Sequence, residues 1–214
     1  MKTLFKTTAF DYRGFSLINE KEFYSSIVGF VLYGLFASYL TSLFAPTEIS
    51  LIELILIGLV LPIVGCLISL SDNMTTSFLG YNLIVIPIGY ILGPTLNHYS
   101  PNLLQDALLI TGFMTLLFGF AGVIYPNLFK SLGGILFYSL MGLVIVRLLS
   151  IFIPGLNLGI IDYISAGIFS LYIGYDMYRA SNASRTYTGA LHIAVSLYLD
   201  IINLFMSILS ILKN

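Results

Sequence analysis

Three ionisable residues, Arg147, Asp176 and Asp200, lie inside otherwise apolar stretches of the sequence. A charged side chain in such a stretch is unfavourable unless a partner compensates it, so each of the three is a candidate functional residue. Asp176 ends the segment SLYIGYD, and Asp200 ends the similar segment SLYLD. Because these segments follow one another along the chain, we expect the two carboxyl groups to face each other.

The spacing of Asp176 and Asp200 fits a helical hairpin. They are 24 residues apart, so a hairpin folded about position 188 would place both at one depth, roughly two to three turns from the bend. Two carboxylates about 4 Å apart repel each other by about 4 kcal/mol at an effective dielectric constant near 20. The pair would then share one proton below neutral pH and lose it above, which is a pH switch. The alternative is two unrelated polar residues, each hydrated from the inner membrane surface.

The elements that must position this pair are membrane-spanning helices. Of the 214 residues, 58% are hydrophobic and 9% are charged, with a mean hydropathy of +0.97. A spanning helix needs about 20 mostly apolar residues. Seven stretches qualify, near 23–45, 51–70, 78–97, 107–126, 131–152, 159–178 and 190–212. We predict an all-α integral membrane protein, a seven-transmembrane-helix bundle over 23–214, after a tail over 1–22 that is either cytosolic or an amphipathic helix in the membrane surface.

The basic residues predict the orientation, because loops rich in Lys and Arg are retained in the cytosol. With the amino terminus in the cytosol, seven basic residues fall on the inner side and only Lys213 on the outer side. The seven are Lys2, Lys6, Arg13, Lys21, Lys130, Arg179 and Arg185. The net charge of −1 does not favour nucleic-acid binding, and the lone Cys66 excludes an internal disulfide.

Arg147 has a candidate partner in Asp162. The two residues are placed symmetrically about Pro154-Gly155, so a turn there would bring them level near the outer face. We expect an ion pair that closes the outer end of the bundle. The alternative is that Arg147 extends to the outer membrane surface without a partner.

The last segments carry a family resemblance. The stretch SLYLDIINLF at 196–205, together with SLYIGYD at 170–176, resembles the signature of the Bax inhibitor-1 family (transmembrane Bax inhibitor motif proteins), in particular its bacterial branch; GYILGPTLNHY at 89–99 adds a weaker likeness. The resemblance implies a seven-helix bundle with the last helix at its centre, in a bacterial inner membrane. It also implies a pH-dependent calcium leak gated by Asp176 and Asp200, where calcium is the transported ion and no cofactor is needed.

The resemblance leaves two details of the gate open. Side chains that could donate hydrogen bonds near the acids are Tyr172, Tyr175, Tyr198 and Asn203. Relatives have a basic cluster after the second segment, where this chain has Ser71-Asp72-Asn73-Met74. Either the shared proton alone closes the path, or Arg179 or Arg185 takes the place of that cluster.

Two other classes of function compete with a channel. Paired aspartates also occur in intramembrane aspartyl proteases, but Asp200 follows Leu-Tyr-Leu rather than Gly-x-Gly, and the sequence contains no Pro-Ala-Leu triplet. His98 and His192 fall on opposite sides of the membrane, so the residues for zinc or nucleophilic catalysis are missing, and we expect no enzyme. The remaining alternative is a regulatory protein that acts on a membrane-bound AAA protease or on a cell-death response.

Overall fold

The computed structural model describes residues 16–152 and 159–213, and this part of the chain is helical. The elements are α1 (Glu20–Leu43), α2 (Leu51–Ile55), the π-helix η1 (Leu56–Val60), α3 (Leu61–Ser69), α4 (Met74–Leu96), α5 (Pro101–Ile124), α6 (Pro126–Phe152), α7 (Gly159–Asn182) and α8 (Tyr187–Lys213). Because α2, η1 and α3 follow without a break, these elements form seven helical rods. Lys2, Lys6, Arg13 and the turn predicted at Pro154-Gly155 lie outside the described residues.

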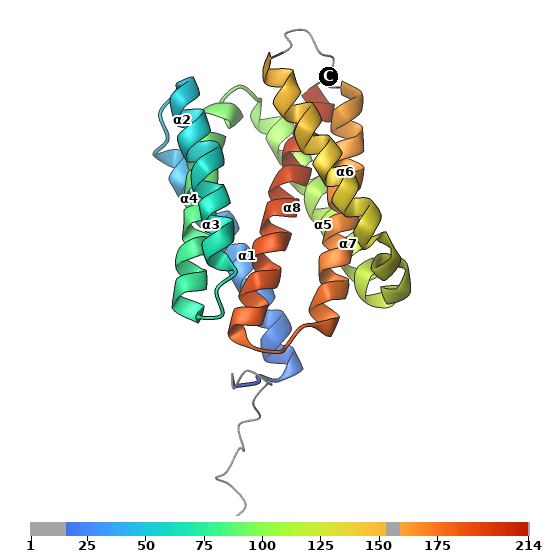
Figure 1. Ribbon diagram of the computed structural model, residues 1–214. Coiled ribbons are helices and arrows are strands. Elements are labelled where there is room, and N and C mark those ends of the chain that lie inside the picture. The colour runs from blue at the N-terminus through green and yellow to red at the C-terminus, as the bar shows by residue number, and fades with distance from the viewer. Residues whose placement is uncertain (1–15, 153–158, 214) are drawn as a thin grey trace, which may run out of the picture.

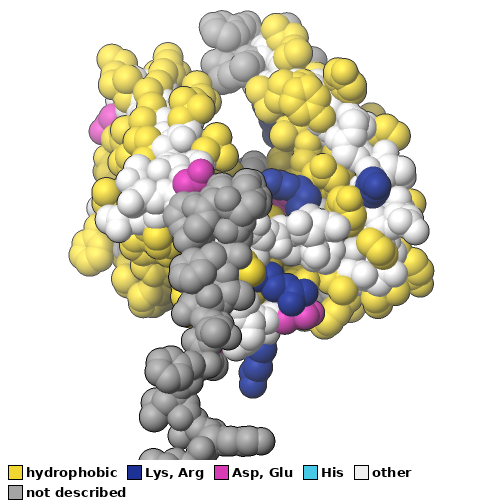
Figure 2. Space-filling model, turned by 60° about the horizontal axis from the view of Figure 1, so that its bottom comes forward, with side chains coloured by type: hydrophobic (Ala, Val, Ile, Leu, Met, Phe, Trp, Pro, Cys, Tyr) yellow, Lys and Arg dark blue, Asp and Glu magenta, His cyan; other side chains and the backbone are white. Residues whose placement is uncertain are grey.

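The rods run back and forth between two ends of the bundle (Figure 1). One end, called here the hairpin end, holds the α7–α8 connection and the start of α1. The other, called the carboxy-terminal end, holds the α1–α2 connection and Lys213. Figure 2 shows apolar side chains on the flanks, with Lys and Arg side chains on the face seen from the hairpin end.

Six of the seven rods are long and apolar enough to cross a membrane, as α1, α2 to α3, α4, α5, α6 and α8. The exception is α7, which contains Asp162, Asp176 and Arg179. Large apolar side chains such as Phe113 and Phe120 point outward, with about two thirds of their surface exposed. A bundle that buries polar groups and exposes apolar ones is adapted to lipid, so the chain is a multi-pass integral membrane protein.

Four rods begin with polar capping residues that hydropathy alone does not detect. Asn19 and Ser50 each form a capping box, with Glu22 and Glu53 respectively. Asn73 and Ser100 accept a hydrogen bond from the backbone N–H three residues on, which starts α4 and α5. The helices therefore start up to six residues before the apolar stretches predicted for them, because each cap satisfies free N–H groups outside the apolar run.

The second rod contains a π-helical turn directly before Pro62. The N–H of Leu61 donates to the carbonyl of Leu56, five residues earlier, so the helix is locally wider. Proline has no N–H and crowds the preceding turn, which accounts for a change of helical geometry at this position.

Two glycines allow helices to approach closely on either side of the bundle. A methyl group at Gly89 of α4 would collide with the backbone of Ser38 in α1, and one at Gly122 of α5 would collide with the carbonyl of Gly174 in α7. The α1–α4 and α5–α7 contacts are thus backbone-to-backbone, and each pair is expected to move as a unit.

Helix α8 packs against α1, α3, α4, α5 and α7 (Figure 1). Tyr198, fully buried, shares a 2.5 Å hydrogen bond with Ser38 of α1 and packs edge-on against Tyr81 of α4. The buried residues of α8 extend from Thr188 to Leu209. This helix is therefore supported on one side by α1 and α4 and on the other by α7, the helix that carries Asp176.

Candidate gate between helices α7 and α8

A short connection sets α7 and α8 side by side in opposite directions. Four residues, 183–186, join the helices, and Thr186 accepts a 2.9 Å hydrogen bond from the N–H of Gly189 to begin α8. The N–H of Ile18 donates to the carbonyl of Arg185 in the same connection, at 2.8 Å. This geometry brings Asp176 and Asp200 to the interface between the two helices.

The two carboxyl groups are buried against each other. Asp176 is 1% exposed and Asp200 is 7% exposed, and their carboxyl groups lie within hydrogen-bonding distance of each other. The Oδ2 atom of each is buried and receives no hydrogen bond from any donor in the described part of the chain. Two ionised carboxyl groups have no hydrogen to donate, so this contact becomes a hydrogen bond only when one proton lies between them.

Arg179 is the basic residue beside the pair. Its Nη1 lies 2.8 Å from Oδ1 of Asp176, one turn away on the same helix, and 3.5 Å from the hydroxyl of Ser196 on α8. Its side chain is 44% exposed, whereas that of Asp176 is 2% exposed. Arg185 instead pairs with Glu20 of α1, at 3.1 Å. Of the two arginines considered from the sequence, Arg179 is therefore the one that contacts the carboxyl pair, through Asp176.

The segment after the second rod contributes its backbone to this region rather than a basic side chain. The carbonyl of Ser71 lies 3.1 Å from Nε2 of His192 on α8. His192 and Ser196 precede Asp200 by eight and four residues, a spacing that places all three on one face of a helix. This spacing is the signal by which His192 and Ser196 are recognisable in the sequence.

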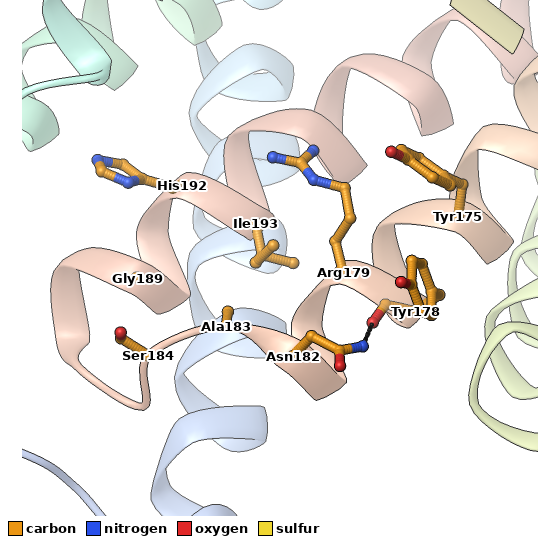
Figure 3. A pocket seen from close by; sticks show the side chains of 9 residues that line it. All are labelled: Tyr175, Tyr178, Arg179, Asn182, Ala183, Ser184, Gly189, His192 and Ile193. Carbon is orange, nitrogen blue, oxygen red and sulfur yellow. Dashed lines mark hydrogen bonds between the residues drawn. The ribbon is translucent and has the colours of Figure 1, made fainter. Parts of the chain in front are cut away.

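An open pocket of about 430 Å³ lies at the hairpin end beside the pair. Figure 3 shows Arg179 extending from α7 across the space between the helices, with His192 on α8 and the tyrosines of α7 around it. The lining residues are Tyr175, Tyr178, Arg179, Asn182, Ala183, Ser184, Gly189, His192 and Ile193. Arg179 both lines this pocket and contacts Asp176, so its side chain stands between the pocket and the buried carboxyl pair.

The four candidate hydrogen-bond donors separate into two groups. Tyr172 lies near enough to Asp176 and Asp200 to interact electrostatically with both, and Tyr175 lines the pocket. Tyr198 points away, toward Ser38, and the Asn203 amide donates to the carbonyl of Leu199 in its own helix. The structure thus places Tyr172 beside the acids, Tyr175 at the pocket, and Tyr198 and Asn203 in other contacts.

A second polar cluster lies at the carboxy-terminal end. Arg147 forms an ion pair with Oδ1 of the buried Asp162, and the hydroxyl of Ser210 donates to Oδ2 at 2.5 Å. The placement of Arg147 follows from α6, in which Phe129, Leu136 and Leu143 are buried at intervals of seven residues. Arg147 comes four residues after Leu143 and so falls on the same face.

A mainly apolar layer, in which Ser170 of α7 is also buried, lies between the two polar clusters along the α7–α8 interface. It is formed by Phe169 and Ile173 of α7 and Leu204 of α8, all buried. Among the described residues, no group of three or more His, Cys, Asp and Glu side chains is arranged so that it could hold a metal ion.

Together, fold and site define a multi-pass helical membrane protein with two carboxyl groups buried against each other between its last two helices. The family model described as "Inhibitor of apoptosis-promoting Bax1" matches residues 20–214. The chain therefore belongs to the Bax inhibitor-1 family, which confirms the resemblance noted in the sequence.

Individual relatives are distant and come from bacteria, plants and yeast. An uncharacterised membrane protein of Vibrio cholerae is 29% identical over 78% of this chain and 75% of its own. Protein LIFEGUARD 4 of Arabidopsis thaliana is 30% identical over 64% of this chain and 57% of its own. Bax inhibitor 1 of Schizosaccharomyces pombe is 34% identical over 58% of this chain and 47% of its own.

Proposed function

We propose that this chain is a pH-sensitive calcium leak channel, gated by one proton shared between Asp176 and Asp200. The observation that carries the proposal is the pair of buried carboxyl groups that contact each other. One oxygen of each carboxyl group receives no hydrogen bond from the described part of the chain. Such an arrangement is strongly unfavourable with two negative charges and favourable with one.

The closed state holds one proton more than the open state. Raising the pH therefore favours the open state, because stability shifts toward the form that binds fewer protons. When the shared proton leaves, the two carboxylates repel each other, and α7 separates from α8 at the level of the pair. Helix α5 accompanies α7 because of the close contact at Gly122, while Tyr198 keeps α8 attached to α1.

Calcium suits the site that results. It is a hard cation that prefers carboxylate, hydroxyl and carbonyl oxygens, and separated carboxylates offer such ligands. Conduction requires a site that binds the ion weakly enough to release it. A site with two carboxyl groups meets this requirement, because it offers few charged ligands. The pocket lined by Arg179 and His192 gives solution at the hairpin end a route toward the pair.

The orientation and localisation form part of the same proposal. All seven rods span the membrane with α8 at the centre of the bundle, the hairpin end faces the cytosol, and the membrane is a bacterial inner membrane. The basic side chains at the hairpin end and the Vibrio cholerae relative support this assignment. The chain has no catalytic role in this proposal.

A regulatory role in cell death is suggested by the names of the family and of the fission yeast relative. The two roles differ in what they need. A leak channel conducts calcium when it is the only protein in a membrane, whereas a regulator of a protease or of a death pathway needs its partner.

The proposal is tested with the purified protein in liposomes that contain a calcium indicator. Calcium flux should rise as the pH increases through neutrality, and Asp176→Asn and Asp200→Asn should each flatten that dependence. Asp106→Asn, which changes an exposed aspartate of α5, is the matched control and should behave as the wild type. A flux independent of pH in the wild type, or one unchanged in both Asn variants, contradicts the proposal.

A further inference from the structure

The polar cluster at the carboxy-terminal end joins three helices around one buried carboxylate. Asp162 of α7 is 2% exposed and is bound by Arg147 of α6 and by the hydroxyl of Ser210 of α8. About one turn deeper, the hydroxyls of Ser165 and Ser207 lie 2.8 Å apart, both buried. A carboxylate and three hydroxyl groups therefore follow one another inward along the α7–α8 interface.

This cluster is distinct from the carboxyl pair. Asp162 precedes Asp176 by 14 residues on the same helix, which corresponds to about 21 Å along its axis. The buried side chains of Phe169, Ile173 and Leu204 lie between the two. A change at one cluster therefore does not alter the contacts of the other directly.

Arg147 stands on the outer side of Asp162 at the carboxy-terminal end. Its side chain is 40% exposed, whereas that of Asp162 is 4% exposed, so the guanidinium lies between the carboxylate and the surface. A guanidinium is a cation that the chain itself supplies, and it neutralises Asp162. The oxygens around Asp162 are the types that hard divalent cations prefer.

We infer that Asp162 and Ser210 form a second, transient cation site at the carboxy-terminal end, and that Arg147 is the tethered cation that closes it. This inference rests on the proposed calcium leak and adds a gate in series with the carboxyl pair. Calcium that reaches Asp162 must displace Arg147 and then passes the hydroxyls of Ser165 and Ser207. The site is transient because it offers a single carboxylate.

The test measures calcium flux in proteoliposomes against calcium concentration, at an alkaline pH at which the carboxyl pair is open. Arg147→Gln removes the competing cation and should lower the half-saturating calcium concentration by about fivefold, the factor expected for a partly exposed ion pair. Arg147→Lys keeps a tethered cation and should remain near the wild type. Asp162→Asn removes the ligand and should raise the half-saturating concentration.

The half-saturating calcium concentration should fall in Arg147→Gln and rise in Asp162→Asn. These opposite changes distinguish a cation site from a packing role, because a loss of packing would change this concentration in the same direction in both variants. At acidic pH, Arg147→Gln should still be closed, because Asp176 and Asp200 are unchanged. Lys130→Gln, which removes an exposed charge at the other end of α6, is the matched control.

Two results would overturn the inference in distinguishable ways. A wild-type flux that depends on pH, with half-saturation unchanged in Arg147→Gln, overturns the second gate alone. A wild type without calcium flux overturns the proposed function and this inference with it.

Discussion

Arg179 should set the pH at which the protein opens. Its Nη1 lies 2.8 Å from Oδ1 of Asp176, and two unit charges about 4 Å apart interact by about 4 kcal/mol at an effective dielectric constant near 20. The side chain of Arg179 is 44% exposed, so water reduces this interaction to about 1 kcal/mol. Since about 1.4 kcal/mol corresponds to one pH unit, Arg179→Gln should move the midpoint of calcium flux by about one unit.

The shift should be toward alkaline pH. The guanidinium stabilises the ionised form of the closed pair, so without it the closed state retains the shared proton to a higher pH. The assay is calcium flux into proteoliposomes over a series of pH values. Arg179→Lys should shift the midpoint little, and Arg185→Gln, which removes the arginine paired with the exposed Glu20, should leave it in place. An unchanged or more acidic midpoint for Arg179→Gln would refute the role assigned to this residue.

Two further predictions concern the fold. Gly122→Ala should lower the thermal unfolding temperature in detergent, because the new methyl group collides with the carbonyl of Gly174 and overpacking costs roughly 1 to 3 kcal/mol. Gly142→Ala is the control, because open space surrounds Gly142. Equal effects of the two substitutions would contradict the close contact at Gly122. In a Cys66→Ala background, Lys213→Cys should react with an impermeant thiol reagent applied outside intact cells, and labelling only after the cytosolic side is exposed would refute the proposed orientation.

Much of the fold follows from simple features of the sequence. The lengths of the apolar stretches locate the rods, because a bilayer requires helices of about 20 residues. The similar segments around Asp176 and Asp200, with a short polar connection between them, predict that the two acids meet. That meeting depends only on a tight hairpin and on helical geometry, both of which are local properties.

Other parts of the site depend on helices distant in the sequence. Arg185 is as basic as Arg179, but Glu20 of α1 is available to bind it. Tyr198 is two residues from Asp200, yet its hydroxyl reaches Ser38 because α1 packs on that side of α8. Ser210 joins the Arg147–Asp162 ion pair only once α8 is seated against α7. Predicting such contacts requires knowledge of which helix faces meet, and a single sequence does not provide it.

Infrared spectroscopy of the reconstituted protein tests the shared proton most directly. A protonated, buried carboxyl group has a carbonyl stretching band that disappears on ionisation. We expect this band to be present at acidic pH and to disappear with the same midpoint at which calcium flux rises. Neither Asp176→Asn nor Asp200→Asn should show this transition near neutral pH. A wild type without the band at acidic pH, or with a transition that does not coincide with the flux, would contradict the shared proton as the gate.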